Sequence, residues 1–467
     1  MTSNGREKNM SQLAYQVTNP ATGAVGESFP SASEAEVEQA LTDAASAFQD
    51  WRRRPIEERV AIAKKVASLF AERAEDLGRL SATEMGKAEA EGSGEAEFCA
   101  DIFTYYADNG PELLAPRPVP GNDSARVEYR AVGAIIGVMP WNYPFYQVAR
   151  FAAPNLIVGN TMILKHAENC PTSALAIAQI MRDAGVPDGV YVNLFATHEQ
   201  VASMIADRRI QGVSLTGSER AGTAVAAEAG RNLKKVVLEL GGSDPYIVLD
   251  SPDVDGAAET AWGFRIENVG QACNSNKRMI VMDDIYDDFV SGLTKRAAAM
   301  KPRLEGGSAT DEYSPMVTRK AAEALLAQVQ DAVDKGATLH TGGTLLDGPG
   351  AFFAPAVLTG VTPDMRAYHE ELFGPVAVVY RISDDDEAVR LANAVDYGLG
   401  GAVWSTDEER ATAVASRLDV GMANVNTPAG EGADLPFGGT KRSGFGRELG
   451  PLGIEEFVNK QLFYVHR

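Results

Sequence analysis

Apolar positions recur at helical spacing through the first part of the chain. The side chains that form this stripe are Val37, Leu41, Ala44, Phe48 and Trp51. Ser33 precedes the stripe, and Glu36 lies three residues after Ser33, which is the pattern of a capping box. A second amphipathic run begins at Pro55, and the Pro-rich residues 110–123 indicate a connector. The pattern therefore predicts a mainly helical segment up to about residue 110.

Short apolar, β-branched runs replace the helical pattern beyond residue 130. They occupy residues 132–140, 161–166, 190–195, 212–217 and 234–242, and amphipathic segments alternate with them. Strand–helix alternation at this spacing predicts a doubly wound parallel sheet. Such sheets bind nucleotides at the carboxyl ends of their strands, where the loops converge.

A second α/β succession runs from about residue 250 to residue 437. Residues 284–301 and 384–400 have helical patterns, and residues 352–361 and 374–382 have strand-like patterns. The run GPVAVVYRI at 374–382 begins with apolar residues that do not alternate with polar ones. It is therefore predicted to be buried on both faces of a sheet.

Composition narrows the class of protein. A length of 467 residues predicts two or three domains, and 45% hydrophobic with 23% charged residues is typical of globular proteins. The net charge of −21 would repel nucleic acids and anionic membrane surfaces, so neither is expected as a partner. A phosphate-bearing cofactor stays possible, because backbone N–H groups at helix N-termini bind phosphate whatever the net charge.

Cysteine and histidine usage gives no sign of a disulfide framework or a metal site. Three cysteines are present, with no CxxC motif and no HExxH-like histidine pair. The first 16 residues lack the apolar core of a signal peptide, and the longest apolar runs are far shorter than a membrane span. A cytoplasmic enzyme without a metal is the expectation.

Cys273 lies in an unusual setting for a thiol. The surrounding residues read NVGQACNSNKR, which are small and polar, whereas a cysteine used as a small hydrophobe has apolar neighbours. An inert buried thiol is one interpretation, but flanking amides and glycine favour a nucleophilic thiolate. Cys99 and Cys170 have no comparable setting and are interpreted as structural.

Three further loops carry candidate chemistry at the ends of predicted strands. Asn142 stands between two prolines in MPWNYPF, where a stiff loop would hold its amide for an oxyanion or simply form a tight turn. Glu239 ends an apolar strand before two glycines, as a general base or as a structural carboxylate. No GxGxxG is present, but Gly217 and Ser218 open a helix after a strand, where a pyrophosphate or an ordinary serine cap would fit.

These motifs, in this order, resemble the NAD(P)-dependent aldehyde dehydrogenase superfamily over nearly the whole chain. Further matching motifs are NPATG, EMGK, LKHAEN, EELFGPV and PFGGTKRSGFGRE. The resemblance implies an α/β fold with a Rossmann-like cofactor domain, a second α/β catalytic domain and a small β oligomerisation element. The expected boundaries are 1–117 with 136–241 for the cofactor domain, 242–443 for the catalytic domain, and 118–135 with 444–467 for the oligomerisation element.

The resemblance also assigns roles to particular residues. Cys273 matches the nucleophile, Glu239 the general base and Asn142 the oxyanion amide. The positions that match cofactor-binding residues are Trp141, Lys165, Glu168, Gly217, Ser218, Leu240, Glu371 and Phe373. Of these, Glu168 resembles a carboxylate that binds the adenine ribose hydroxyls and repels a 2′-phosphate, so NAD is the expected cofactor and NADP is possible.

The substrate is expected to be a small-molecule aldehyde. Arg150 matches an arginine that binds the distal carboxylate in succinate-semialdehyde dehydrogenases, which favours succinate semialdehyde. Glu267 departs from that pattern, because those enzymes can carry a second arginine six residues before the nucleophile. A neutral or amino-aldehyde is therefore the alternative, and a coenzyme A-acylating enzyme is a less favoured one, since such enzymes do not need the base at Glu239.

The C-terminal segment predicts self-association. The final strand, residues 461–467, resembles the family segment that pairs with a partner subunit together with the hairpin around residues 118–135. Left exposed, its apolar edge would promote aggregation. A homodimer or a homotetramer is expected.

Overall fold

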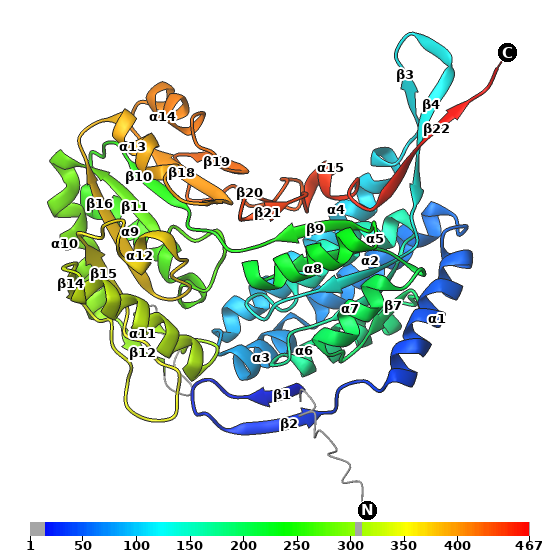
Figure 1. Ribbon diagram of the computed structural model, residues 1–467, viewed down its shortest axis with the longest axis horizontal. Coiled ribbons are helices and arrows are strands. Elements are labelled where there is room, and N and C mark those ends of the chain that lie inside the picture. The colour runs from blue at the N-terminus through cyan, green and yellow to red at the C-terminus, as the bar shows by residue number, and fades with distance from the viewer. Residues whose placement is uncertain (1–14, 304–310, 467) are drawn as a thin grey trace, which may run out of the picture.

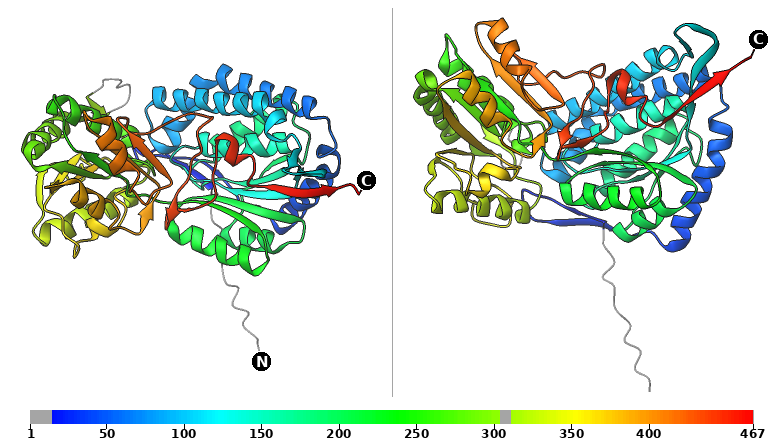
Figure 2. Two further views of the ribbon diagram at one scale, coloured as in Figure 1. Left: turned by 90° about the horizontal axis from the view of Figure 1, so that it is seen from above. Right: turned by 45° about the horizontal axis from the view of Figure 1, so that its top comes forward.

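The computed structural model describes residues 15–303 and 311–466 of the chain. The extreme N-terminus, in which no signal-peptide core was expected, lies outside the described residues except for Tyr15 and Gln16. Two sheets, each with its own helices and hydrophobic core, form two lobes that lie side by side (Figures 1 and 2). Across the described ranges, no helix is long and apolar enough to cross a membrane.

The first lobe contains a six-stranded sheet in the order β21-β9-β8-β5-β6-β7. Its strands are β5 (Ala134–Val138), β6 (Thr161–Lys165), β7 (Tyr191–Asn193), β8 (Ile210–Thr216), β9 (Lys235–Glu239) and β21 (Gly444–Phe445). β5 to β9 pair in parallel, which confirms the five strands predicted from the apolar runs. The intervening helices are α5 (Tyr146–Val158), α6 (Pro171–Asp183), α7 (His198–Ala206) and α8 (Glu219–Arg231).

The second lobe contains a seven-stranded sheet in the order β14-β15-β16-β11-β10-β18-β19. Its strands are β10 (Pro245–Val248), β11 (Arg278–Met282), β14 (Thr338–Thr341), β15 (Ala356–Thr359), β16 (Val376–Ile382), β18 (Gly400–Trp404) and β19 (Met422–Val425). Its helices are α9 (Val254–Ile266), α10 (Asp283–Ala299), α11 (Arg319–Asp334), α12 (Arg366–His369), α13 (Asp385–Ala392) and α14 (Glu408–Ala415). Six of the seven residues of β16 are buried, as its unbroken apolar run predicted.

The predicted N-terminal helical segment is present as four helices. These are α1 (Glu34–Trp51), α2 (Ile56–Glu72), α3 (Ala74–Met85) and α4 (Glu89–Leu113). The capping box of Ser33 and Glu36 is formed. The predicted connector at 110–123 is wrong in part, because α4 continues through Pro111 and residues 117–119 form β3. The helix is held there by packing, since Gly110 lies so close to α5 that a Cβ would meet Ile157 Cγ2 at 2.5 Å.

A three-stranded sheet projects from the first lobe (Figure 1). It consists of β3 (Arg117–Val119), β4 (Asn122–Ala131) and β22 (Val458–Tyr464), with β4 in the centre. Leu462 and Tyr464 on β22 are 64% and 55% exposed, so this edge presents apolar side chains. Residues 444–445 were assigned to the same element but pair with β9, and the domain boundaries as a whole stay a prediction.

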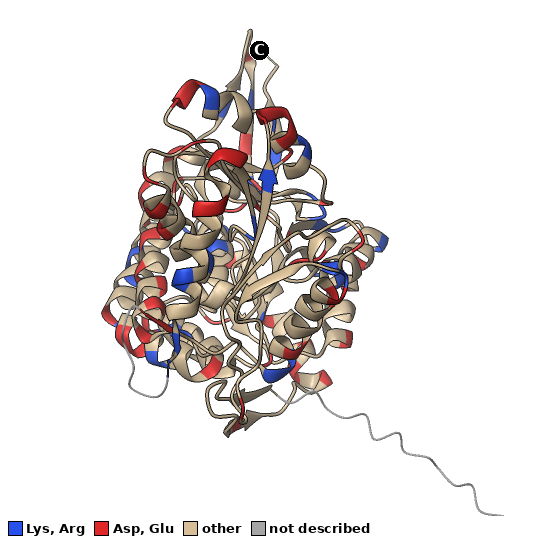
Figure 3. Ribbon diagram, turned by 90° about the vertical axis from the view of Figure 1, so that its left-hand side faces the viewer, with Lys and Arg blue, Asp and Glu red and all other residues tan. Residues whose placement is uncertain are grey.

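The remaining elements are short. They are β1 (Tyr15–Thr18), β2 (Val25–Phe29), the 3-10 turn η1 (Glu267–Gly270), β12 (Lys301–Pro302), β13 (Glu312–Tyr313), β17 (Tyr397–Gly398), β20 (Thr440–Lys441) and α15 (Gly450–Gly453). Many of the Asp and Glu residues that give the chain its negative charge lie on helices (Figure 3).

Candidate active site

The candidate residues of the first lobe lie at one edge of its parallel sheet. Asn142 follows β5, Gly217 and Ser218 follow β8, and Glu239 is the last residue of β9. Thr216 pairs with Glu239 in register, so the ends of β8 and β9 are adjacent. The chain then crosses from β9 to β10 in the second lobe through residues 240–244, which brings this edge to the loop that carries Cys273.

The loop that carries Cys273 leaves α9 through a strained turn. Asn268 and Val269 have φ angles of 47° and 50°. Residues other than glycine adopt this left-handed conformation only at a cost in free energy. Gly270 follows at φ 76°, and a Cβ there would meet the Gly374 carbonyl oxygen at 2.4 Å. The turn is therefore pressed against the segment that carries Glu371 and Phe373.

Arg265 holds the turn at Gly270 against the segment that carries Glu371 and Phe373. Its side chain is fully buried, and its guanidinium donates to the carbonyls of Gly270, Leu372, Gly374 and Val376 and to the Ser275 hydroxyl. Five donor contacts in a rigid planar group define one relative position of the two loops. Arg265 thus binds protein carbonyls and has no free donor for a substrate carboxylate.

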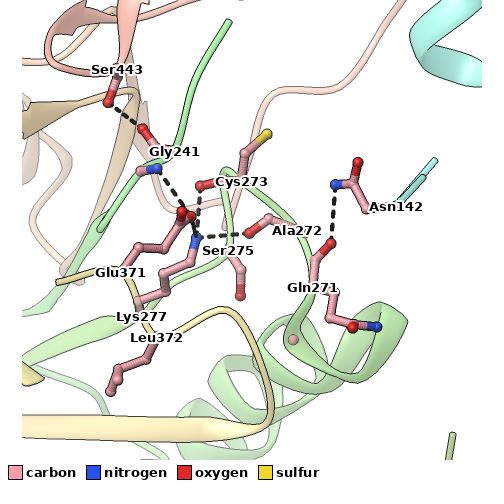
Figure 4. A network of polar contacts seen from close by, with 12 residues as sticks. Asn142, Gly241, Gln271, Ala272, Cys273, Ser275, Lys277, Glu371, Leu372 and Ser443 are labelled. Atoms are coloured by element: carbon pink, nitrogen blue, oxygen red, sulfur yellow. Dashed lines mark hydrogen bonds and ion pairs between the residues drawn. The ribbon is translucent and has the colours of Figure 1, made fainter. Parts of the chain in front are cut away.

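Asn142 is joined directly to the nucleophile loop (Figure 4). Its side-chain Nδ2 donates to the Gln271 backbone carbonyl at 3.1 Å. The backbone carbonyl of Asn142 accepts from Asn268 Nδ2 at 2.9 Å. The loop is stiffened from behind by Glu95 of α4, which accepts from the N–H groups of Phe145 and Tyr146 at 2.8 and 3.0 Å. The amide is therefore held within the cluster that contains Cys273.

Glu239 is a buried carboxyl group without hydrogen-bond partners. Its side chain is 2% exposed, and among the described residues neither oxygen has a partner. Burial raises the pKa of Glu239 well above its ordinary range, and Arg150 opposes that shift. A carboxyl group with a raised pKa and no competing partner is suited to accept a proton from water near neutral pH.

A cavity of about 370 Å³ opens onto Cys273. Tyr143, Tyr146, Phe264, Asn274 and Phe437 are among the residues that line it. The Cys273 thiol is a neutral group at rest, because burial raises its pKa to about 11. The cavity is large enough for a small aldehyde beside the thiol.

Arg150 does not line this cavity. Its Nε is 2.5 Å from Glu448 Oε2, and its Nη2 donates to Thr216 Oγ1 at 3.3 Å. The guanidinium lies between the rings of Tyr146 and Phe437, at 4.8 and 4.5 Å from their centres. Its predicted contact with a substrate carboxylate would require a change in the ion pair with Glu448.

The predicted cofactor residues lie along the same edge of the first sheet. Lys165 at the end of β6 forms an ion pair with Glu168, and His198 Nε2 is 3.3 Å from the same Glu168 oxygen. Ser218 caps α8 through the Ala221 N–H. A Cβ on Gly217 would meet nothing closer than Leu215 at 3.6 Å, so space for a phosphate remains at this helix N-terminus.

The other predicted cofactor residues lie closer to Cys273. Trp141 and Phe373 pack edge to face, with ring centres 5.7 Å apart. Glu371 accepts from the Gly242 N–H and pairs with Lys277. Leu240 contacts α8 at Gly222, where a Cβ would meet its Cδ2 at 2.6 Å. The carboxylates of Glu168 and Glu371 and the N-terminus of α8 have the chemistry that suits the ribose hydroxyls and the pyrophosphate of a dinucleotide.

Sequence reasoning missed several residues that build the site. Lys277 and Asn268 stand inside or beside the stretch that singled out Cys273, and their polar character in a buried loop was an available signal. Glu448 gave no such signal, because its partner Arg150 lies in a distant part of the sequence. Within the described part of the chain, no group of three or more possible ligands could hold a metal ion.

Known proteins resemble this chain over almost its full length. The sequence profile of the Aldehyde dehydrogenase family matches residues 7–463. A protein of Deinococcus radiodurans named succinate-semialdehyde dehydrogenase (NADP(+)) is 53% identical over 96% of this chain and 94% of its own. A protein of Mycobacterium avium with the same name is 42% identical over 96% of both chains.

Solved structures resemble the fold equally closely. The succinic semialdehyde dehydrogenase of Streptococcus pyogenes in complex with NADP+ has a TM-score of 0.93, with 40% identity over 97% of this chain and 100% of its own. An NAD+ complex of an aldehyde dehydrogenase from Bacillus cereus has a TM-score of 0.92, with 30% identity over 97% and 93% of the chains. The chain therefore belongs to the aldehyde dehydrogenase family.

Proposed function

We propose that the protein oxidises succinate semialdehyde to succinate with NAD(P), using Cys273 as the nucleophile. The observation that carries this proposal is that Cys273 lines a cavity of about 370 Å³ on a loop to which the Asn142 amide is hydrogen-bonded through the Gln271 carbonyl. Glu239 supplies a buried carboxyl group without a hydrogen-bond partner among the described residues. The names of the relatives at 53% and 42% identity support this choice of aldehyde. A cytoplasmic location stays a prediction from the sequence.

The three residues divide the work of the reaction. The Cys273 thiolate attacks the aldehyde carbon, and the Asn142 amide donates to the oxygen as it becomes negative. A bound nicotinamide ring supplies the hydride acceptor. The acyl group is then held on the Cys273 sulfur as a thioester, and Glu239 takes a proton from the water that releases it as the acid.

Asn142→Ala is expected to lower kcat/KM by about 10²- to 10³-fold, since one oxyanion donor contributes about 3 kcal/mol to the transition state. Steady-state NAD(P)H formation measures the effect. The control is Asn193→Ala, which removes an amide on β7 away from the cavity. Equal losses in the two variants would contradict the oxyanion role of Asn142.

The choice of aldehyde is tested by a substrate panel of succinate semialdehyde, propanal and an aminoaldehyde. The proposal expects the highest kcat/KM for succinate semialdehyde, and it fails if either other aldehyde is turned over as well. Release of the acid without added thiol separates this reaction from transfer to coenzyme A. If Arg150 binds the substrate carboxylate as predicted, Arg150→Ala raises the KM for succinate semialdehyde. An unchanged KM would show that this contact is absent.

A neutral or amino-aldehyde is the second candidate because the cavity wall is acidic. Glu91, Glu267 and Glu431 all line the cavity, and Tyr143 donates to Glu267 at 3.0 Å. Among the described residues, the basic side chain on the wall is Lys87, which is paired with Glu95. These charges would attract a cationic aldehyde more than an anionic one.

The cofactor is NAD(P), and we propose a preference for NAD because of Glu168. Burial alone would raise the pKa of Glu168, but Lys165 lowers it below its ordinary value, so the carboxylate is negative at neutral pH. Glu168→Ser is expected to shift the ratio of kcat/KM toward NADP by about tenfold or more, since the repulsion of a 2′-phosphate is removed. The relatives whose names specify NADP(+) make this a direct test. A higher efficiency with NADP that Glu168→Ser does not change would refute it.

We further propose that the protein forms a homodimer or a dimer of dimers through β22. The support is the exposed apolar edge of Leu462, Phe463 and Tyr464 on a sheet that projects from the body. Light scattering gives the mass directly, and the Leu462→Arg variant is expected to shift it toward the monomer. A monomeric wild-type protein would overturn this proposal.

A further inference from the structure

Glu168 lies between two basic side chains at the edge of the first sheet where its parallel strands end. Lys165, the last residue of β6, pairs with Glu168 Oε1, and His198 Nε2 is 3.3 Å from the same oxygen. The Lys165 side chain is buried and that of Glu168 is 31% exposed, whereas that of His198 is 70% exposed. The ion pair therefore lies inside, and the imidazole on its outer side is free to exchange a proton with solvent.

β1 holds the segments that carry these side chains next to each other. The Gln16 N–H donates to the Glu168 backbone carbonyl at 2.9 Å, and the Tyr15 hydroxyl donates to the Ala196 carbonyl at 2.8 Å. β1 thus joins the loop after β6 to the loop between β7 and α7, the helix that begins at His198. The proximity of these two loops is therefore set by the fold.

Other titratable groups lie at the start of α7. Glu199 follows His198 and interacts with it electrostatically, and Glu34 of α1 accepts from Gln200. Burial raises the pKa of Tyr15 on β1 above its ordinary range, so this phenol stays neutral. α8 and β8 also pack against α7, but no ion pair in the part of the chain that the structure describes joins either of them to His198. Histidine is the side chain that ordinarily changes its charge between about pH 5 and 8, so a change of charge here in that range is assigned to His198.

A 2′-phosphate distinguishes NADP from NAD by its charge, which is about −1.5 to −2 for a phosphate monoester at neutral pH. The proposed ribose contact of Glu168 brings this phosphate to the Lys165–Glu168 pair, whose charges cancel. A neutral His198 offsets none of the added charge, whereas a protonated His198 makes the cluster positive and donates two N–H groups. The ribose hydroxyl of NAD is uncharged, so its binding depends little on His198.

We propose that His198 sets the choice of cofactor according to pH: the protonated imidazole beside Glu168 stabilises the 2′-phosphate of NADP, and the neutral imidazole leaves a site that favours NAD. This inference rests on the proposed cofactor contact of Glu168 and is independent of the aldehyde. The proton is exchanged with solvent, and no covalent bond forms or breaks.

Cofactor affinity, measured without any aldehyde, tests this inference. Isothermal titration calorimetry of the full-length protein gives the Kd of NAD+ and of NADP+ over the range in which histidine titrates, about pH 5.5 to 8.5. The variants are His198→Gln, which is neutral throughout, and His198→Lys, which keeps a positive charge. His340→Gln is the matched control, because His340 is an exposed histidine on β14 of the second lobe.

The ratio of the NAD+ Kd to the NADP+ Kd is expected to increase in the wild type as pH decreases. One nearby surface charge gives a rise of about three- to tenfold between about pH 8 and pH 6. His198→Gln should keep the ratio at its alkaline value or lower it, since the phosphate itself gains a proton in this range. His198→Lys should keep the ratio high even at the alkaline end, and His340→Gln should match the wild type.

Three results would overturn the inference. The first is a ratio in the wild type that does not change with pH. The second is a pH dependence in His198→Gln equal to that of the wild type, which would assign the effect to the phosphate alone. The third is a His198→Lys variant that binds NADP+ no better than the wild type at alkaline pH. The proposed oxidation of succinate semialdehyde fails by a different result, namely a protein with this pH-dependent affinity that oxidises no aldehyde of the panel.

Discussion

Cys273→Ala is expected to lower aldehyde oxidation by more than about 10⁴-fold while the protein stays folded. Without the sulfur no thiohemiacetal forms, and Asn142 and Glu239 are left with no bond to stabilise or hydrolyse. The substituted side chain lies on the cavity wall, so its removal disturbs little packing. Formation of NAD(P)H with the best aldehyde of the panel measures the loss, and circular dichroism checks the fold.

The other two cysteines provide matched controls for this variant. Cys99 and Cys170 are fully buried, and burial raises the pKa of each thiol well above its ordinary value. Cys99→Ala and Cys170→Ala are expected to cost about 1 kcal/mol of stability and to keep the activity. An active Cys273→Ala variant would remove the basis of the proposed reaction.

Local sequence patterns were sufficient to predict much of the fold. The capping box at Ser33 and the five strands of the first sheet depend on residues within a few positions of one another, so periodicity reveals them. The end of α4 does not depend on local pattern. Pro111 and Gly110 indicate a loop by composition, but the packing of Gly110 against α5 extends the helix through them.

The site divides in the same way. Cys273, Asn142 and Glu239 each stand in a recognisable local motif, and each follows or ends a predicted strand or lies in a loop that its own sequence singles out. The pairing of Arg150 with Glu448 joins α5 to a segment near the C-terminus, and no local pattern contains that contact. The same holds for Arg265, whose five acceptors lie in two separate segments, residues 270–275 and 372–376.

Charge at the cavity is the property that sequence patterns described least well. Glu267 was a single departure from the resemblance, but in the structure Glu91 and Glu431 lie on the same wall. Both side chains are exposed, but partial desolvation on the cavity wall raises the pKa of each, and Glu267 adds to each shift. Protonation of these carboxyl groups would reduce repulsion of an anionic aldehyde. The KM for succinate semialdehyde is therefore expected to fall as pH decreases, whereas that for propanal stays constant.

Glu239→Gln is expected to separate the two halves of the reaction. The variant keeps the shape of the side chain, and neither Glu239 oxygen has a hydrogen-bond partner among the described residues, so the fold should tolerate it. Acyl transfer to Cys273 proceeds once per site, and hydrolysis then slows by about 10²- to 10⁴-fold. A burst of NAD(P)H followed by a slow phase records this, and intact mass spectrometry detects the acyl group on the protein.

The pH dependence of hydrolysis gives the sign of the Glu239 contribution. Only the carboxylate accepts a proton from water, so hydrolysis in the wild type increases as pH rises through the pKa of Glu239. Burial raises that pKa above the ordinary range of a carboxyl group, which moves the increase to higher pH than an exposed glutamate would give. The amide that Glu239→Gln introduces does not titrate, so the variant should lose this increase. A variant that hydrolyses the thioester as fast as the wild type, with the same pH profile, would show that another group activates the water.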